Sequence, residues 1–247
     1  MYTLSSRAKS INNGFAESKR EKGNTNIDWL RSHWRPDRVA MLLVGGTDLI
    51  HFRLRIAQSH LRNDLTPSHW SHVALLGEST VADLYAAPLY EISLTPAGGF
   101  GFPTARNCLQ NSTLEKYGDP KLFPNIAILY LPPSVEPRML MNAVERFQQQ
   151  RIVIDAVQLL LAWLGYAWGA GRAGNPLLDG LGMPSAAMLE TVTGAAGFDL
   201  TPGLESRASC PEAIWQSARW WHEYHEENKE GPITGAFYTP HRLPAGQ

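Results

Sequence analysis

The chain has 247 residues, of which 44% are hydrophobic and 18% charged, and its formal net charge is −1. This length allows one elaborated domain or at most two small ones. A net charge so near zero argues against a nucleic-acid partner, because such proteins need an excess of basic residues to neutralise phosphates. Two cysteines, Cys108 and Cys210, are too few for a disulfide framework, although one bridge between them is allowed.

Residues 1–25 are polar and predict a flexible N-terminal arm, and residues 26–247 are expected to form a single domain. No apolar run near the N-terminus resembles a secretory signal. The longest apolar stretch, at 156–171, is shorter than the ~20 residues that span a bilayer. We therefore expect a soluble chain made in the cytoplasm without a signal peptide and without a stable membrane span.

The first half of the chain predicts alternating helices and strands. The expected elements are a short helix at 28–34, a strand at 39–44, a helix after Asp48 that carries Leu49, Phe52 and Ile56, and a strand at 70–76. A second strand at 79–85 would close a hairpin through a two-residue Gly77-Glu78 loop. In that register His72 lies opposite Asp83, and both side chains point to the same face.

The second half begins with a long irregular connection at 88–124, which contains one expected strand at 90–94. Further expected elements are a strand at 125–131, helices at 136–150 and 152–163, a short helix at 186–192 and a last strand at 236–240. The glycine-rich segment 165–205 predicts an insertion or lid.

The sequence Ser209-Cys210-Pro211-Glu212 is typical of a helix start. Proline suits the first helical position, and an acidic residue suits the positive end of the helix dipole. Cys210 would then lie beside unpaired backbone N–H groups, which favour the thiolate. A small buried cysteine without a catalytic role is the alternative interpretation.

A helix-start cysteine, a strand histidine and a carboxylate together make the architecture of a cysteine hydrolase. The histidine takes the thiol proton and later protonates the leaving group, while the carboxylate fixes the histidine tautomer. The candidates here are Cys210, His72 and Asp83. The histidines are scattered and show no zinc-ligand spacing, so we expect no metal and no cofactor.

Four segments in this order resemble the circularly permuted NlpC-type papain-like amidases and peptidases, the YiiX-like group. They are the glycine-aspartate strand end (44–50), the Ser71-His72-Val73 strand, Val81-Ala82-Asp83, and the Cys210 helix start. Asp83 stands where the family often has Glu, and Pro211 where it has Ser. Tyr166, in Gly165-Tyr166-Ala167-Trp168-Gly169, is similar to a Tyr-x-Trp-Gly segment of unpermuted members and is a candidate auxiliary or oxyanion residue, with core packing as the alternative.

The resemblance implies an α+β, papain-like fold in which a small antiparallel sheet packs against helices. It also implies an amidase or endopeptidase that cleaves peptidoglycan stem peptides. By analogy, such a chain could be an antibacterial toxin that the type VI secretion system delivers to a target cell's periplasm, with an immunity protein as partner. The alternatives are a lipid acyl-ester hydrolase or acyltransferase on the same fold, and a non-catalytic binding module.

Overall fold

The structure is a computed structural model that describes residues 15–78, 80, 82–99, 101–150, 154–169, 173–224 and 233–243. It is a mixed α/β fold built on one seven-stranded sheet with the order β1-β7-β6-β2-β3-β4-β5. The strands are β1 (Phe15–Glu17), β2 (Ala40–Gly45), β3 (His72–Leu76), β4 (Pro88–Glu91), β5 (Gln110–Thr113), β6 (Asn125–Tyr130) and β7 (Thr234–Tyr238). Neighbouring strands are antiparallel except for β1 and β7.

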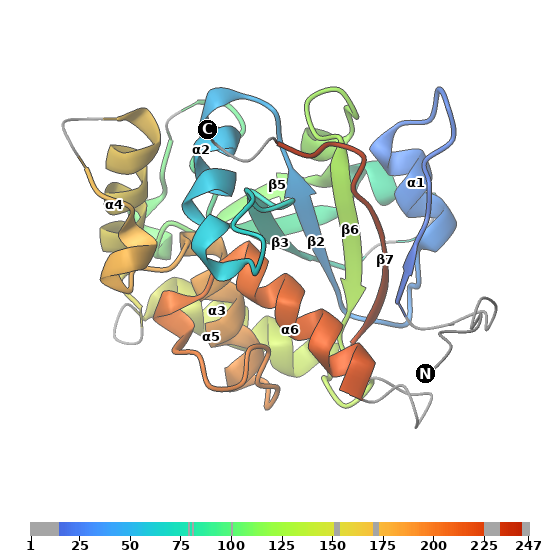
Figure 1. The fold of residues 1–247 in the computed structure, drawn as a ribbon. Coiled ribbons are helices and arrows are strands. Elements are labelled where there is room, and N and C mark those ends of the chain that lie inside the picture. Colours follow the sequence, from blue (N-terminus) through green and yellow to red (C-terminus); the bar gives the residue numbers. More distant parts are fainter. Residues whose placement is uncertain are drawn as a thin grey trace, which may run out of the picture.

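In the part of the chain that the structure describes, six α-helices surround the sheet (Figure 1). They are α1 (Asn26–His33), α2 (Leu49–Ala57), α3 (Pro137–Gln149), α4 (Ala156–Trp168), α5 (Pro184–Ala195) and α6 (Pro211–Tyr224). Each matches a helix expected from the sequence, with bounds that differ by a few residues. Pro137 and Pro184 open α3 and α5, and Asp48 caps α2 through the backbone N–H of His51, as start-of-helix residues do.

The alternation of side chains along the central strands divides the core into two layers. Met41, Leu43, Val73 and Leu75 point toward α3, α4, α5 and α6 and form the larger cluster. The intervening residues of the same strands pack against α1 and the short turns at Leu84–Ala86 and Leu114–Tyr117. All residues of β2, β3 and β6 are buried, which explains why these strands read as nearly continuous apolar runs.

The expected hairpin between 70–76 and 79–85 is wrong. β3 pairs instead with β2 and with β4, in the register Leu75 to Tyr90 and Leu76 to Leu89. After Gly77 the chain leaves the sheet and makes a 3-10 turn at Leu84–Ala86, and the Leu84 side chain is fully buried in the smaller cluster. Burial of Leu84 therefore outweighs the local turn preference, and the strand next to β3 comes from later in the sequence.

Two expectations about the domain organisation also differ from the structure. Residues 1–14 of the expected arm lie outside the described residues, but Phe15–Glu17 forms an edge strand and Thr25 caps α1 with a reciprocal capping box to Asp28. The expected insertion or lid at 165–205 contains α5, whose side chains are largely buried against β3 and α3. The described part of this segment is therefore a structural element of the core.

Candidate active site

Cys210 immediately precedes α6, as the sequence predicts, and its side chain is completely buried. The backbone N–H of Met183 donates to the carbonyl of Ser209, which ties the α6 start to the start of α5. Glu212 in the first turn accepts a hydrogen bond from Ser68 Oγ at 2.5 Å, and its backbone N–H donates to Gln58. The cysteine is therefore held in place by contacts on both sides of the helix start.

The expectation that this position favours the thiolate is wrong for the structure as it stands. The pKa of the Cys210 thiol is raised to about 12, chiefly by burial and to a smaller extent by the carboxylates of Glu212 and Glu190. The N–H groups of Ala213 and Glu212 lower the pKa, but by less. Desolvation thus outweighs the helix start, and the resting group is a thiol.

Glu190 on α5 is a second buried carboxyl next to the cysteine segment. Its Oε1 accepts hydrogen bonds from Thr201 Oγ1 at 2.6 Å and from Ser209 Oγ at 3.1 Å. Burial nevertheless raises the pKa of Glu190 to about 7. This group links the segment before Cys210 to α5.

His72, the first residue of β3, has a well-defined acidic partner. Its Nε2 lies 2.8 Å from Glu91 Oε2 on β4, and both side chains are buried. Tyr117 Oη donates to the same oxygen at 2.6 Å, while Ser112 Oγ and Lys116 Nζ donate to Oε1 at 2.8 and 2.6 Å. Each carboxylate oxygen therefore accepts two hydrogen bonds, which satisfies a buried carboxylate.

The charges of this network favour an ionised glutamate and a neutral histidine. Burial opposes ionisation of Glu91, but the hydrogen bonds with His72 and Lys116 and the positive charge of Lys116 outweigh it and hold the pKa of Glu91 well below its usual range. Burial, together with Lys116 and His51, lowers the pKa of His72 despite its bond to Glu91. Neutral His72 then carries its proton on Nε2, toward Glu91, which leaves the Nδ1 lone pair as a base.

A small cavity joins His72 to the start of α6. His72 lies in its wall together with Ser71, His51 on α2, Ser185 on α5 and Pro211, the residue directly after Cys210. The cavity volume is about 10 Å³, which is about the space of a single water molecule. The site is closed, and a substrate would have to open it.

The Cys210 thiol and the His72 imidazole belong to different layers of the core, and the residue of the α6 start that lines the cavity is Pro211 rather than Cys210. Cys210 belongs to the larger cluster, on the α6 side, whereas the His72 ring stacks on Tyr117 of the smaller cluster, with ring centroids 5.8 Å apart. In the part of the chain that the structure describes, no hydrogen bond joins Cys210 to His72. The cavity lies at the first residues of β3, where the two layers meet.

The two weaker candidates from the sequence do not lie at this cavity. Asp83 is exposed, and its carboxylate accepts a hydrogen bond from Thr80 Oγ1 at 2.9 Å. It is not paired with the histidine, because the hairpin that would have placed them opposite each other does not form. Tyr166 packs edge-on against Trp163 on α4, with ring centroids 5.6 Å apart, and is not among the residues around the cavity.

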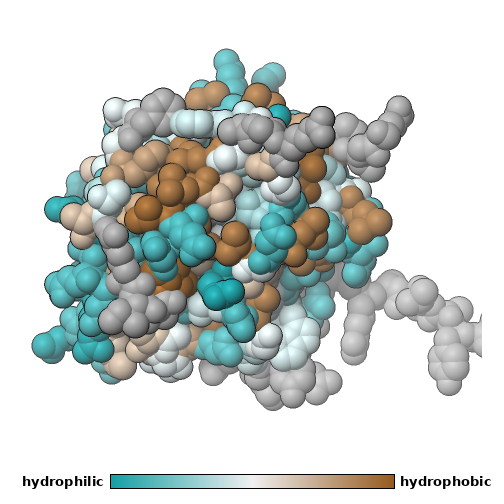
Figure 2. All heavy atoms as spheres, turned by 90° about the vertical axis from the view of Figure 1, so that its left-hand side faces the viewer, coloured by the Kyte–Doolittle hydropathy of each residue, from teal (hydrophilic) through white to brown (hydrophobic). Residues whose placement is uncertain are grey.

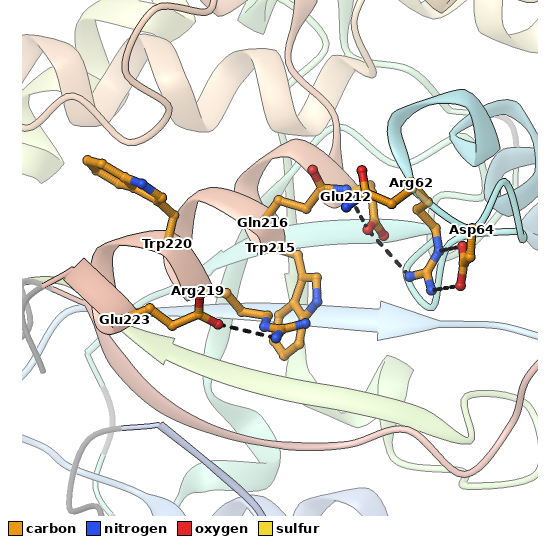
Figure 3. Close-up of a pocket in the computed structure, with 9 residues that line it drawn as sticks. Arg62, Asp64, Glu212, Trp215, Gln216, Arg219, Trp220 and Glu223 are labelled. Atoms are coloured by element: carbon orange, nitrogen blue, oxygen red, sulfur yellow. Dashed lines mark hydrogen bonds and ion pairs between the residues drawn. The ribbon is translucent and has the colours of Figure 1, made fainter. Parts of the chain in front are cut away.

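A larger and more polar groove lies beside the first turn of α6 (Figure 3). Its volume is about 330 Å³, and it runs between Arg62–Asp64 and the exposed face of α6. Arg62 pairs with Asp64 at 3.0 Å and with Glu212 at 3.4 Å, and Arg219 pairs with Glu223 at 3.3 Å. The groove therefore presents paired charges of both signs, and one of them, Glu212, lies two residues after Cys210.

The sequence analysis did not identify Glu91, Lys116 or Tyr117 as site residues. The sequence around Glu91 nevertheless contains a signal that could have identified it. Glu91 follows Leu89 and precedes Ile92 in a strand that is otherwise apolar, and Leu89 and Glu91 share one face. A carboxylate on a buried strand face needs a partner, so its presence there indicates a polar network. Lys116 and Tyr117 reach it only through the tertiary fold.

Within the described residues, no group of three or more His, Cys, Asp or Glu side chains is placed to hold a metal ion. None of the helices in that part of the chain has both the length and the apolar character that crossing a bilayer requires. Comparisons with family models, curated proteins and solved structures found no match to this chain.

Proposed function

We propose that the protein is a cysteine-nucleophile hydrolase, with Cys210 as nucleophile, His72 as general base and Glu91 as the residue that orients His72. The observation that carries the proposal is the 2.8 Å contact between His72 Nε2 and Glu91 Oε2 on a cavity whose wall includes Pro211. Glu91 takes the role that the sequence suggested for Asp83. The papain-like, permuted NlpC-type character of the fold is part of this proposal.

In the proposed reaction His72 Nδ1 accepts the proton of the Cys210 thiol, and the sulfur attacks the acyl carbon of the substrate. The imidazolium then protonates the leaving group, and water releases the acyl enzyme with His72 as base again. The backbone N–H of Cys210 is the candidate oxyanion donor, since Pro211 has no N–H and the N–H of Glu212 is already donated to Gln58. Because Cys210 and His72 lie in different layers of the core and are not hydrogen-bonded, the proposed reaction requires substrate binding to rearrange the start of β3 so that Nδ1 reaches the thiol.

The preferred substrate class is the amide bond of peptidoglycan stem peptides, which follows from the family resemblance. The polar groove along α6 supports a peptide, because its paired arginines and carboxylates match charges of both signs on a substrate. The corresponding biological role is an antibacterial effector of a type VI secretion system, with an immunity protein in the producing cell.

The second candidate is a lipid acyl-ester hydrolase or acyltransferase that uses the same three residues. The observation in its favour is the apolar lining of the small cavity, which includes Ile50, Leu54 and Ile92. Acyl chains suit such walls better than charged peptides do.

A side-by-side assay tests both candidates. Purified protein is incubated with peptidoglycan sacculi and with phospholipid vesicles, and new amines and free fatty acids are measured. Release of amines that is lost in Cys210→Ala and in His72→Ala, both folded by circular dichroism, would support the amidase, and release of fatty acids alone would favour the lipid reaction. Neither product, or full activity in Cys210→Ala, would contradict the cysteine mechanism and favour a binding module.

A further inference from the structure

An exposed apolar face covers the side of the molecule formed by α2 and α4. Figure 1 places these helices next to each other, and Figure 2 shows that hydrophobic side chains gather on this side. Six large apolar side chains on three segments are at least 37% exposed: Leu49, Phe52 and Ile56 on α2, Leu161 and Trp168 on α4, and Leu178 in the 3-10 turn Pro176–Asp179. Apolar patches on a folded protein's surface mark interaction sites.

Specific contacts hold the three segments together, so the face is a fixed part of the fold. Arg53 on α2 donates to the carbonyls of Tyr166 and Ala167 at the end of α4, at 3.0 and 3.3 Å. Asn175, which caps the 3-10 turn, donates to the carbonyl of Ala57 at the end of α2, at 2.7 Å. The exposed side chains therefore lie on three segments that are hydrogen-bonded to one another.

Helix α2 carries apolar side chains on two faces. Leu54 and Ala57 are buried in the larger cluster, and His51 and Arg55 are buried as well. Leu49, Phe52 and Ile56 recur at helical spacing as a second apolar stripe, which faces outward. An exposed stripe of this kind needs a partner that accepts apolar side chains.

The composition of α4 points to lipid as that partner. Its 13 residues carry no charged side chain, and Tyr166 and Trp168 stand at its C-terminal end. Aromatic residues at the end of an apolar helix are typical of the boundary between lipid headgroups and acyl chains. A helix of about 20 Å is too short to span the bilayer and suits a position in its surface.

The two helices of this face contain no acidic residue, and Arg53 on α2 is a partly exposed cation held across the end of α4. The exposed carboxylates of Asp48 and Asp179 lie next to Leu49 and Leu178, so the cationic contact with a membrane is confined to the Arg53 part of the face. An arginine at that level can pair with headgroup phosphates while its stem stays among apolar groups.

We propose that the α2/α4 face, defined by Leu49, Phe52, Ile56, Leu161, Trp168 and Leu178, docks on the surface of an anionic bilayer. The first turns of α2 connect this face to the candidate site, since Ile50, His51 and Leu54 line the small cavity. Docking would present the closed cavity near the lipid surface. This surface binds lipid whether or not Cys210 is a nucleophile.

Vesicle sedimentation tests the proposal in the Cys210→Ala background, so that no hydrolysis interferes. The vesicles contain phosphatidylethanolamine with either 30% phosphatidylglycerol or an equal share of phosphatidylcholine. We expect binding to the anionic vesicles, reduced about tenfold or more by each of Phe52→Glu and Leu161→Glu, because each removes one large apolar side chain from the lipid contact. Arg53→Gln should weaken binding to the anionic vesicles and leave the neutral ones unchanged.

Met139→Glu and Leu204→Glu are the matched controls, because both residues are apolar, exposed (47% and 40%) and lie outside the three segments of the face. They should bind vesicles as the parent protein does. Absence of vesicle binding, or an equal loss in the control variants, would overturn the proposal. A dimer in light scattering that Leu161→Glu dissociates, without vesicle binding, would assign the face to a second copy of the chain and also overturn it.

Discussion

His72 and Glu91 lie on neighbouring strands, and the Nε2 of the histidine is 2.8 Å from a carboxylate whose four acceptor positions are all used. Because Lys116 already balances the charge of Glu91, the histidine can stay neutral and keep a fixed tautomer. This is the arrangement that a general base needs before it meets its nucleophile.

Substitution of Glu91 should therefore affect both activity and stability, whereas substitution of Asp83 should affect neither. Glu91→Ala leaves Lys116 and Tyr117 without their acceptor, and loss of one partner of a buried ion pair costs about 3–5 kcal/mol of unfolding free energy. Glu91→Gln keeps the shape and should lower kcat by about 10²–10⁴, as wrong histidine tautomers do in a serine protease triad. Asp83→Ala is the control, and its unfolding free energy should change by less than about 0.5 kcal/mol.

Two measurements check this prediction. The first is kcat on the substrate that the side-by-side assay identifies, and the second is the unfolding of each variant in denaturant. Loss of activity in Asp83→Ala together with full activity in Glu91→Gln would restore Asp83 as the orienting residue.

The buried thiol should react slowly in the resting protein. With a pKa of about 12, the thiolate fraction of Cys210 at pH 8 is roughly a thousand-fold below that of a free cysteine. Alkylation by iodoacetamide, followed by intact mass in Cys108→Ala, measures this rate. Cys108 is also buried, and no disulfide joins it to Cys210 in the structure. Addition of substrate should speed the alkylation of Cys210 if it opens the cavity, and fast alkylation without substrate would contradict a closed site.

Acid should destabilise the protein below about pH 6.5. Burial lowers the pKa of His72 and lowers that of His69 to about 4, so below the unfolded value of about 6.5 the unfolded chain binds more protons than the folded one. Stability that is present above pH 6.5 is then lost as the pH falls toward 4. The lowered pKa of Glu91 also stabilises the folded state at neutral pH, and this contribution is lost at still lower pH.

Urea unfolding of the wild type and of His69→Asn between pH 4 and 8 tests the acid prediction. The variant should show a smaller loss of stability on acidification, and identical pH curves for the two proteins would contradict it.

Much of this fold can be predicted from local sequence patterns, namely apolar runs, helical periodicity and helix-start residues, because the structure keeps the elements that they predict. The buried strands β2, β3 and β6 lie within two residues of their expected bounds, and Leu140, Ala143, Val144 and Phe147 of α3 are buried as the periodicity predicts. The position of Cys210 before α6 follows from proline and glutamate preferences at helix starts.

The partner of His72 could not be found in the same way, because strand register is decided by burial as well as by the turn. A glycine at position 77 suggested a tight hairpin, but Leu84 finds more apolar contacts in the smaller cluster, and β3 pairs with β4 instead. The outward stripe of α2 is a second example. Its periodicity predicts a helix correctly but does not reveal which face meets the core.

Alkaline pH should also weaken the fold, through Glu190. This carboxyl is buried on α5, accepts hydrogen bonds from Thr201 and Ser209, and has a pKa raised to about 7. A raised folded pKa means that its stabilising contribution is complete below the unfolded value of about 4.3 and is lost as the pH rises through 7. Glu190→Gln keeps an acceptor oxygen for both donors and cannot ionise. We therefore expect this variant to be more stable than the wild type at pH 8.5 and similar to it at pH 5.5.

The control for Glu190 is Glu223→Gln, which removes a carboxylate of an exposed ion pair on α6 and should change stability little at either pH. Because Ser209 directly precedes Cys210, ionisation of Glu190 also places a negative charge near the thiol and raises its pKa further. Glu190→Gln should accordingly speed the alkylation of Cys210 at pH 8.5 relative to the wild type, and Glu223→Gln should not. A wild-type protein equally stable at pH 5.5 and 8.5, with an alkylation rate that Glu190→Gln leaves unchanged, would show that the carboxyl does not ionise in this range.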